Sequence, residues 1–219
     1  MKAQRSFLSV ILAVAACFLA PVVQAADVKG RVVTPAGEPV AQAIVFVKEG
    51  SLPPPEGDRP IAIMDQIDKE FVPHVLPIVV GTPVRFPNHD QIHHHVYSFS
   101  RLKSFDLPLY RDEEPPPVVF DRTGAIRIGC NIHDWMSGVI LVLPTKYFAT
   151  SDATGTFVLR DLPPGSHTLL VWHERSGLKV DETAQLVEVG STAPPELSFT
   201  LPLQDVHERA RENGAREYR

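Results

Sequence analysis

Cys130, His133 and Met136 lie on one short loop, each three residues after the last. They supply a thiolate, an imidazole and a thioether to a single stretch of chain. Two nitrogens and one thiolate in a trigonal set, with a weak axial thioether, form the ligand field that holds copper in electron-transfer sites. The sequence therefore indicates a soft-metal loop whose second nitrogen comes from elsewhere in the chain.

Three adjacent histidines, His93, His94 and His95, are the candidates for that nitrogen. Side chains alternate along a strand, so His94 shares a face with Val96, while His93 and His95 share the opposite face. Either His94 alone is the inward ligand, or His93 and His95 are used as a pair. A chance polar patch on a strand is the alternative that involves no metal.

Residues 1–25 have the pattern of a secretory signal peptide. Lys2 and Arg5 precede an apolar run, and Val23-Gln24-Ala25 matches a cleavage site. We therefore expect an exported protein of the bacterial periplasm, and no later segment is apolar enough to span a membrane. The lesser alternative is a lipoprotein in which Cys17 carries the lipid anchor.

Export makes the cysteine count informative. Cys17 would leave with the signal, so Cys130 would remain as an unpaired thiol in an oxidising compartment. Such a thiol is prone to oxidation, and metal ligation would protect it. Cleavage would also leave 19 Lys plus Arg against 26 Asp plus Glu, a formal charge of −7. This acidic balance argues against a nucleic-acid partner.

The chain reads as an all-β protein, because it holds 21 prolines and no long apolar pattern with a period of 3.6 residues. Strands are expected within 28–47 and at 75–80, 84–86, 93–97, 118–120, 125–130, 138–143, 156–159, 167–172, 184–189 and 197–201. The strands at 75–80 and 84–86 are expected to pair with each other, and residues 100–117 are expected to form a loop.

The strand at 125–130 determines where the cysteine points. Ile126, Ile128 and Cys130 share one face of it, because strand side chains alternate. We therefore expect Cys130 to point into a core at the end of this strand.

The candidate ligands resemble those of the small blue copper proteins, the cupredoxins of the amicyanin and plastocyanin type. Asn88 precedes His94 by six residues, and two residues separate each of the three ligands on the loop, as in amicyanin. On this spacing we favour His94 over His93 and His95. The resemblance implies an eight-stranded Greek-key sandwich.

The same resemblance implies one type 1 copper per chain. His94, Cys130 and His133 are implied as its equatorial ligands, Met136 as the axial ligand, and Asn88 as a residue whose hydrogen bonds brace the ligand loop.

Some residues depart from the amicyanin pattern. Ile132 and Asp134 stand where amicyanin has prolines, and Asp134 with Trp135 places a charge and a large aromatic ring beside the site. The extra histidines could hold a second ion, although surface solvation is the simpler account.

The flanking segments resemble another family. Residues 30–33, 37–40 and 162–169 match carboxypeptidase regulatory-like domains, which are transthyretin-like sandwiches. The implied class is all-β, with a Greek-key cupredoxin sandwich inserted in, or flanked by, a transthyretin-like β-sandwich. The combination is similar to bacterial proteins labelled methylamine utilization proteins. The expected division is a signal peptide (1–25), a first part of the regulatory-like sandwich (26–60), a cupredoxin domain (62–144), a second part of the regulatory-like sandwich (145–203) and a charged tail (204–219).

The resemblance implies a periplasmic one-electron carrier. Its expected partners are redox proteins such as a c-type cytochrome or a periplasmic dehydrogenase. The alternatives are a copper storage or delivery protein and an interaction module with a degenerate or non-redox copper site. An enzyme is not expected, because four protein ligands leave no position for a substrate and no Ser/His/Asp set stands out.

Overall fold

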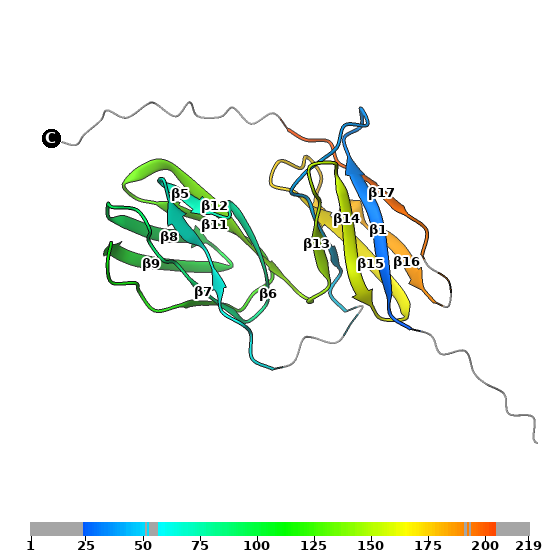
Figure 1. Cartoon of the computed structure of the whole chain (residues 1–219), viewed down its shortest axis with the longest axis horizontal. Coiled ribbons are helices and arrows are strands. Elements are labelled where there is room, and N and C mark those ends of the chain that lie inside the picture. The colour runs from blue at the N-terminus through cyan, green and yellow to red at the C-terminus, as the bar shows by residue number, and fades with distance from the viewer. Residues whose placement is uncertain (1–23, 51, 53–56, 191, 193, 205–219) are drawn as a thin grey trace, which may run out of the picture.

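The computed structural model of the chain describes residues 24–50, 52, 57–190, 192 and 194–204 (Figure 1). Cys17, most of the expected signal peptide and nearly all of the expected tail lie outside the described residues. The helical element within the described residues is a single 3-10 turn, η1 (Val180–Thr183), and the other regular elements are strands. The all-β class is therefore confirmed. No described segment forms a helix with the length and hydropathy of a membrane span.

Strands from the two ends of the described chain form one sandwich, which we call the terminal sandwich. In its first sheet, β1 (Ala26–Val33) lies between β14 (Thr156–Leu162) and β17 (Leu197–Thr200). The second sheet has the order β13 (Phe148–Thr150), β2 (Ile44–Val47), β15 (Gly165–Trp172) and β16 (Gln185–Val189). Apolar side chains from both sheets form one buried core.

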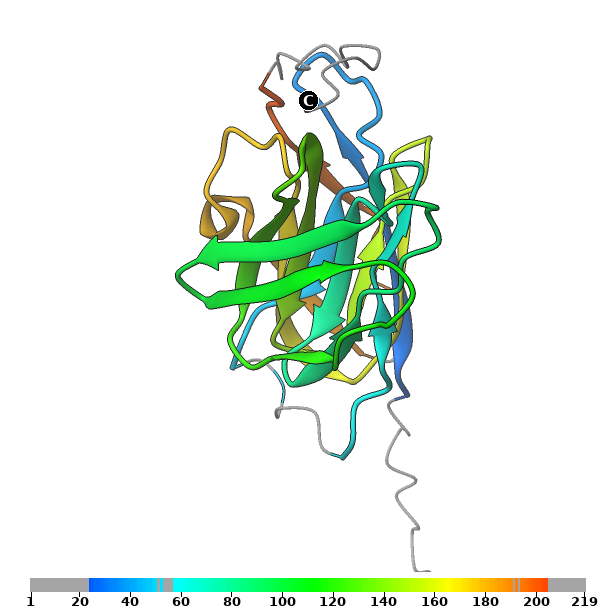
Figure 2. The same ribbon diagram turned by 90° about the vertical axis from the view of Figure 1, so that its left-hand side faces the viewer.

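Strands between residues 62 and 143 form a second sandwich, which we call the middle sandwich. Its three-stranded sheet has the order β10 (Val118–Phe120), β7 (Thr82–Arg85) and β3 (Ala62–Ile63). Its five-stranded sheet has the order β6 (Val75–Val79), β12 (His133–Leu143), β11 (Gly124–Cys130), β8 (His94–Ser100) and β9 (Lys103–Tyr110). A short hairpin of β4 (Asp65–Ile67) and β5 (Glu70–Val72) forms a separate two-stranded sheet in the same sandwich. Figure 2 views the molecule from the side of this sandwich.

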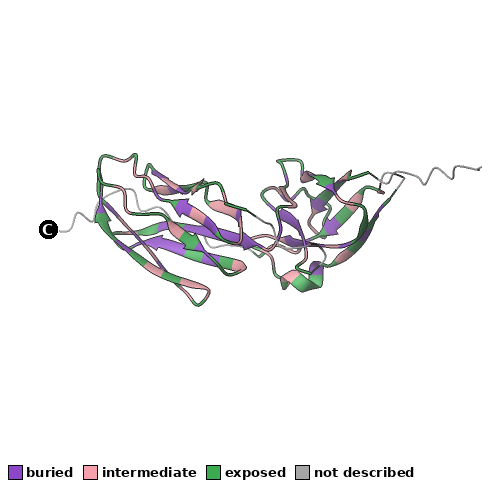
Figure 3. Ribbon diagram, turned by 90° about the horizontal axis from the view of Figure 1, so that it is seen from below, coloured by how far each residue is buried: buried purple, intermediate pink, exposed green. Residues whose placement is uncertain are grey.

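An apolar contact joins the two sandwiches. Leu141 and Leu143 of β12 pack with buried apolar side chains of β2 and β15. Ile140 and Val142, on the other face of β12, lie in the core of the middle sandwich. Because both faces of this strand are covered, its sequence is a continuous apolar run rather than an alternating one. Figure 3 shows buried residues within both sandwiches and at the junction between them.

Two expectations about the strands are wrong. β6 and β7 do not pair with each other, because β6 pairs with β12 and β7 pairs with β10 and β3. Gly81 turns the chain from one sheet to the other with a φ of 86°, which favours glycine. Residues 100–117 are not a loop throughout, because β9 pairs with β8. β9 is an edge strand, which tolerates Pro108 and an exposed Leu109.

A hydrogen-bonded ion pair also bridges the sandwiches. His74 Nε2 lies 2.7 Å from a carboxylate oxygen of Glu174, and Arg127 of β11 lies 3.6 Å from the other oxygen. The hydrogen bond with Glu174 raises the pKa of His74, and the same bond lowers the pKa of Glu174. The contact is therefore strongest while the imidazole is protonated.

We predict that His74→Gln destabilises the protein more at pH 5.5 than at pH 8.5. A histidine whose pKa is raised by folding adds stability below its unfolded pKa, about 6.5, and this stability is lost as the pH rises through the folded pKa. Both side chains are partly exposed to solvent, so the effect should stay below about 1 kcal/mol. Urea unfolding measures it.

Lys48→Gln provides the control, because it removes an exposed ion pair without a histidine, Lys48–Asp181. Its effect should be the same at pH 5.5 and pH 8.5. Equal losses at the two pH values for His74→Gln would contradict the prediction.

Candidate metal centre

Three neighbouring strands of the five-stranded sheet position the candidate ligands. Cys130 ends β11, His133 begins β12, and His94 begins β8 beside β11. The alternation predicted for β8 is confirmed, since His94 and Val96 are fully buried while His93 is exposed. The strand that carries Cys130 likewise directs the sulfur into the core of the middle sandwich.

The ligating atoms of these three residues converge. Cys130 Sγ lies 3.7 Å from His94 Nδ1 and 3.6 Å from His133 Nδ1. All the ligating atoms lie within 4.8 Å of one another. Metal–nitrogen bonds of about 2.0–2.1 Å and metal–sulfur bonds of about 2.3 Å, at trigonal or tetrahedral angles, separate nitrogen and sulfur by about 3.6–3.8 Å. The cluster therefore has the spacing of a metal site.

The cluster brings three groups that can offer lone pairs to a metal side by side. Ring nitrogens of both histidines face the sulfur of Cys130. His94 is 0% exposed and Cys130 is 4% exposed, so there is little solvent access to the sulfur and to this ring. A cation bound by all three groups would satisfy these lone pairs together.

The pKa shifts of Cys130 and His133 also favour a metal, whereas burial of His94 is outweighed by contacts with Cys130 and Asp90 that raise its pKa, so a proton competes with a metal there. Burial alone would raise the pKa of the Cys130 thiol, but hydrogen bonds with His94 and two backbone amides outweigh burial and lower it. Burial, with the nearby positive charge of His94, lowers the pKa of His133. A thiolate and a neutral imidazole are the forms that bind metal ions.

A bulge at the start of β12 shapes the ligand loop. The ladder between β11 and β12 pairs Cys130 with His133, but the preceding residue, Gly129, pairs with Ser137. Residues 134–136 therefore have no partners on β11 and bend the strand away from the regular ladder.

The bulge turns its residues in different directions. Asp134 and Trp135 are exposed, whereas Met136 is 2% exposed and packs in the same buried cluster as Cys130. Met136 thus lies inside the sandwich, in the same core as Cys130. Its role as an axial ligand stays a prediction, because the packing of a buried methionine also accounts for this position.

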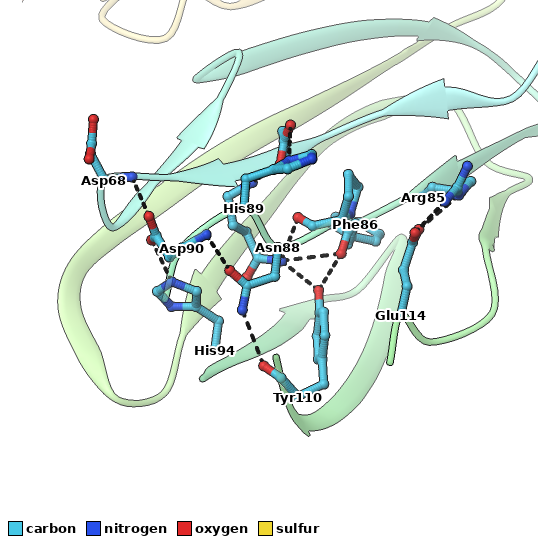
Figure 4. Close-up of polar contacts among 12 residues, drawn as sticks. Asp68, Arg85, Phe86, Asn88, His89, Asp90, His94, Tyr110 and Glu114 are labelled. Atoms are coloured by element: carbon cyan, nitrogen blue, oxygen red, sulfur yellow. Dashed lines mark hydrogen bonds and ion pairs between the residues drawn. The ribbon is translucent and has the colours of Figure 1, made fainter. Parts of the chain in front are cut away.

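Asn88 braces the turn that precedes His94. Its side-chain amide donates to the carbonyls of Ile92 and Tyr110, at 2.9 and 3.3 Å, and its oxygen accepts the N–H of Asp90 at 3.0 Å (Figure 4). These bonds act on the His94 side of the site. The bracing of the Cys130 loop by Asn88 stays a prediction.

The sequence interpretation missed Asp90, which contacts the candidate ligand His94. Asp90 Oδ2 lies 2.7 Å from His94 Nε2, on the opposite side of the ring from Cys130. Burial alone would raise the pKa of Asp90, but hydrogen bonds from the Lys69 and Asp68 amides and from His94 outweigh burial and lower it. The available signal was an acidic residue in the turn four residues before a buried histidine.

The remaining histidines of this region lie outside the cluster. His89 contacts Asp65, and His95 contacts Asp106, while His93 is exposed. Among the described residues, His94, Cys130 and His133 form the single group of three His, Cys, Asp or Glu side chains whose ligating atoms lie together.

Comparison with known proteins gives only structural likenesses. No protein-family model matches the chain, and no curated protein matches it. A reduced point mutant of amicyanin matches 38% of this chain and 82% of its own, with 20% identity and a TM-score of 0.36. A purple cupredoxin from Nitrosopumilus maritimus matches 39% of this chain and 100% of its own, with 24% identity and a TM-score of 0.34. A copper-containing nitrite reductase from Thermus scotoductus SA-01 matches 46% of this chain and 25% of its own, with 24% identity and a TM-score of 0.38. The metal assignment therefore depends on the donor atoms of this chain.

The substitution Met136→Leu distinguishes two roles of Met136, an axial ligand and a residue that only packs in the core. The exchange conserves volume, so the free energy of unfolding of the metal-free protein should fall by less than about 1.5 kcal/mol. If the thioether is a ligand, the reduction potential of the copper-loaded protein changes, because the axial ligand tunes it. Cyclic voltammetry measures this change. An unchanged potential would assign Met136 to the core alone.

Proposed function

We propose that this protein binds one copper ion at His94, Cys130 and His133 and serves as a one-electron carrier. The observation that supports the proposal is the buried sulfur with two ring nitrogens at 3.6 and 3.7 Å. Copper, when bound, supplies exchange of a single electron between Cu(I) and Cu(II). We assign the site to the type 1 class, with Met136 as the weak axial ligand.

The donor set favours copper over zinc. A Cys and two His side chains suit both metals, and zinc sites usually complete a tetrahedron with a further Cys, His, carboxylate or water. The fourth group that we propose is the thioether of Met136, which is soft and uncharged and is buried in the same core as Cys130. Soft thioether donors are typical of copper sites.

The backbone around the ligands is held in one arrangement. His94, Cys130 and His133 lie on adjacent strands of one sheet, and the Asn131 amide donates to the His95 carbonyl at 3.2 Å. This bond ties the ligand loop to β8. Ligands fixed on paired strands keep their positions when the charge of the site changes, which suits a carrier rather than a protein that releases its metal.

The surface beside His133 carries two exposed apolar side chains, Ile132 and Trp135, next to the exposed carboxylate of Asp134. His133 is half-buried, and its ring lies 5.0 Å from that of His94 and 5.5 Å from that of Trp135. Trp135 is 42% exposed and Ile132 is 48% exposed. We propose that redox partners, such as a c-type cytochrome or a periplasmic dehydrogenase, dock here and exchange the electron through His133. The assignment to the periplasm and a link to methylamine metabolism stay predictions.

The visible spectrum tests the copper assignment. Protein loaded with one equivalent of Cu(II) should show an intense visible thiolate-to-copper absorption, and Cys130→Ala should abolish it because the thiolate is lost. His93→Ala, at an exposed histidine outside the cluster, should retain the band. A colourless copper-loaded protein would overturn the assignment, and so would a band that survives in Cys130→Ala.

Redox cycling distinguishes a carrier from a storage or delivery protein. We expect the band to disappear on reduction and to return on reoxidation, with copper retained after gel filtration of the reduced protein. Loss of copper to a chelator on each reduction would instead favour storage or delivery.

We predict that Trp135→Ala slows electron exchange with a small c-type cytochrome by roughly tenfold, because a partly exposed Trp is a frequent anchor of protein contacts. The copper absorption should persist, since no ligand is removed. Leu186→Ala is the matched control, because Leu186 is 68% exposed but lies on β16 of the terminal sandwich. Stopped-flow mixing measures both rates. Equal rates for the wild-type protein and Trp135→Ala would contradict the assigned docking surface.

A further inference from the structure

The two ring nitrogens of His94 have different partners. Nδ1 lies 3.7 Å from Cys130 Sγ, and Nε2 lies 2.7 Å from Asp90 Oδ2. A carboxylate only accepts hydrogen bonds when ionised, so Nε2 is the nitrogen that carries the proton. When the ring is neutral, Nδ1 therefore presents its lone pair to the cluster, and the contact with Asp90 determines which nitrogen is free to bind metal.

Asp90 is itself held by backbone amides. Its Oδ1 accepts the N–H of Asp68 at 2.7 Å, and its Oδ2 accepts the N–H of Lys69 at 2.9 Å (Figure 4). Asp68 and Lys69 form the turn between β4 and β5 with φ values of 54° and 61°, so both residues are in the left-handed region. A further bond joins the N–H of Asp90 to Asn88 Oδ1 at 3.0 Å.

These bonds hold the Asp90 carboxylate in place against His94. The Asp90 side chain is 12% exposed and the His94 side chain is 0% exposed, so the pair is largely removed from water. Three donors converge on one carboxylate, which keeps it ionised and leaves it a single orientation. Its negative charge is therefore fixed next to a ligand ring.

Two other histidine–aspartate pairs are more exposed and do not include a candidate ligand. His89 pairs with Asp65, where the His89 side chain is 67% exposed, and His95 pairs with Asp106, where the Asp106 side chain is 72% exposed. Neither histidine belongs to the metal cluster. Among these pairs, the contact with Asp90 alone reaches the candidate site.

We propose that Asp90 is a positioning residue that orients His94 with Nδ1 toward copper and stabilises Cu(II) relative to Cu(I). This inference depends on the copper-carrier function proposed above. A carboxylate that accepts the second N–H of a ligating histidine makes the ring a stronger donor. A stronger donor and a nearby negative charge both favour the higher oxidation state, so the contact lowers the reduction potential.

The reduction potential of Asp90→Asn tests the proposal. The amide oxygen of Asn can still accept hydrogen bonds from the turn, but the side chain no longer supplies a charged acceptor to Nε2. Loss of such a partner typically weakens metal binding 10- to 100-fold. If the loss falls on Cu(II), the potential rises by about 60 to 120 mV, at 59 mV for each tenfold change in a one-electron couple. The visible band persists, because all ligands remain.

Asp106→Asn is the matched control, because it removes the same charge from the pair with His95 without touching His94. Its potential should move by less than a third of the shift seen in Asp90→Asn. An unchanged potential in Asp90→Asn, or equal shifts in the two variants, overturns the proposal. A wild-type protein without a copper–thiolate band overturns the proposed function instead, so the two failures are distinguishable.

A measurement on the wild-type protein keeps the test independent of how Asp90→Asn folds. Two-bond ¹H–¹⁵N NMR spectra of the diamagnetic Cu(I) form report which ring nitrogen of His94 carries a proton. We expect the proton on Nε2, slow to exchange with solvent, as the buried bond to Asp90 requires. A proton on Nδ1, or a rapidly exchanging Nε2 proton, overturns the proposal.

Discussion

Cys130 Sγ lies 3.7 Å from His94 Nδ1 and 3.6 Å from His133 Nδ1, and the sulfur and the His94 ring have little access to water. Burying three polar groups side by side is costly unless each has a partner. A metal ion bound by all three groups would be a common partner for them. Much of the middle sandwich can be understood as the backbone that keeps these atoms together.

Structural features on three sides of the cluster keep the ligating atoms together. On the loop side, the bulge of β12 exposes Trp135 and buries Met136. On the strand side, β11 lies between β8 and β12, so the three ligands lie on neighbouring strands. On the far side of the His94 ring, Asp90 connects the site to the β4–β5 turn. β12 also packs against the terminal sandwich, so the strand that carries His133 is covered on both faces beyond the bulge.

Local patterns in the sequence predict the inward-facing ligands, because they depend on the two-residue period of a strand. That period places Cys130 inside and puts His94 on the opposite face from His93 and His95, and the spacing from Asn88 favours His94 as the inward residue. The structure buries both His94 and Cys130. Features that depend on contacts between distant segments were not predictable in this way. The sequence interpretation missed β9, where Pro108 interrupts the pattern, and paired β6 with β7 although they lie in different sheets. It also missed Asp90, because an aspartate in a polar turn is ordinary until the fold places a buried ring beside it.

X-ray absorption at the copper edge, on protein loaded with one equivalent of copper, tests the central claim most directly. The technique reports which elements surround the metal and does not depend on a partner protein. Our account predicts one short sulfur neighbour, from Cys130, and two nitrogen neighbours, with the short sulfur neighbour absent in Cys130→Ala; the proposed thioether of Met136 lies at a longer distance. A shell made only of nitrogen and oxygen in the wild-type protein would contradict it, because the ion would then lie away from Cys130.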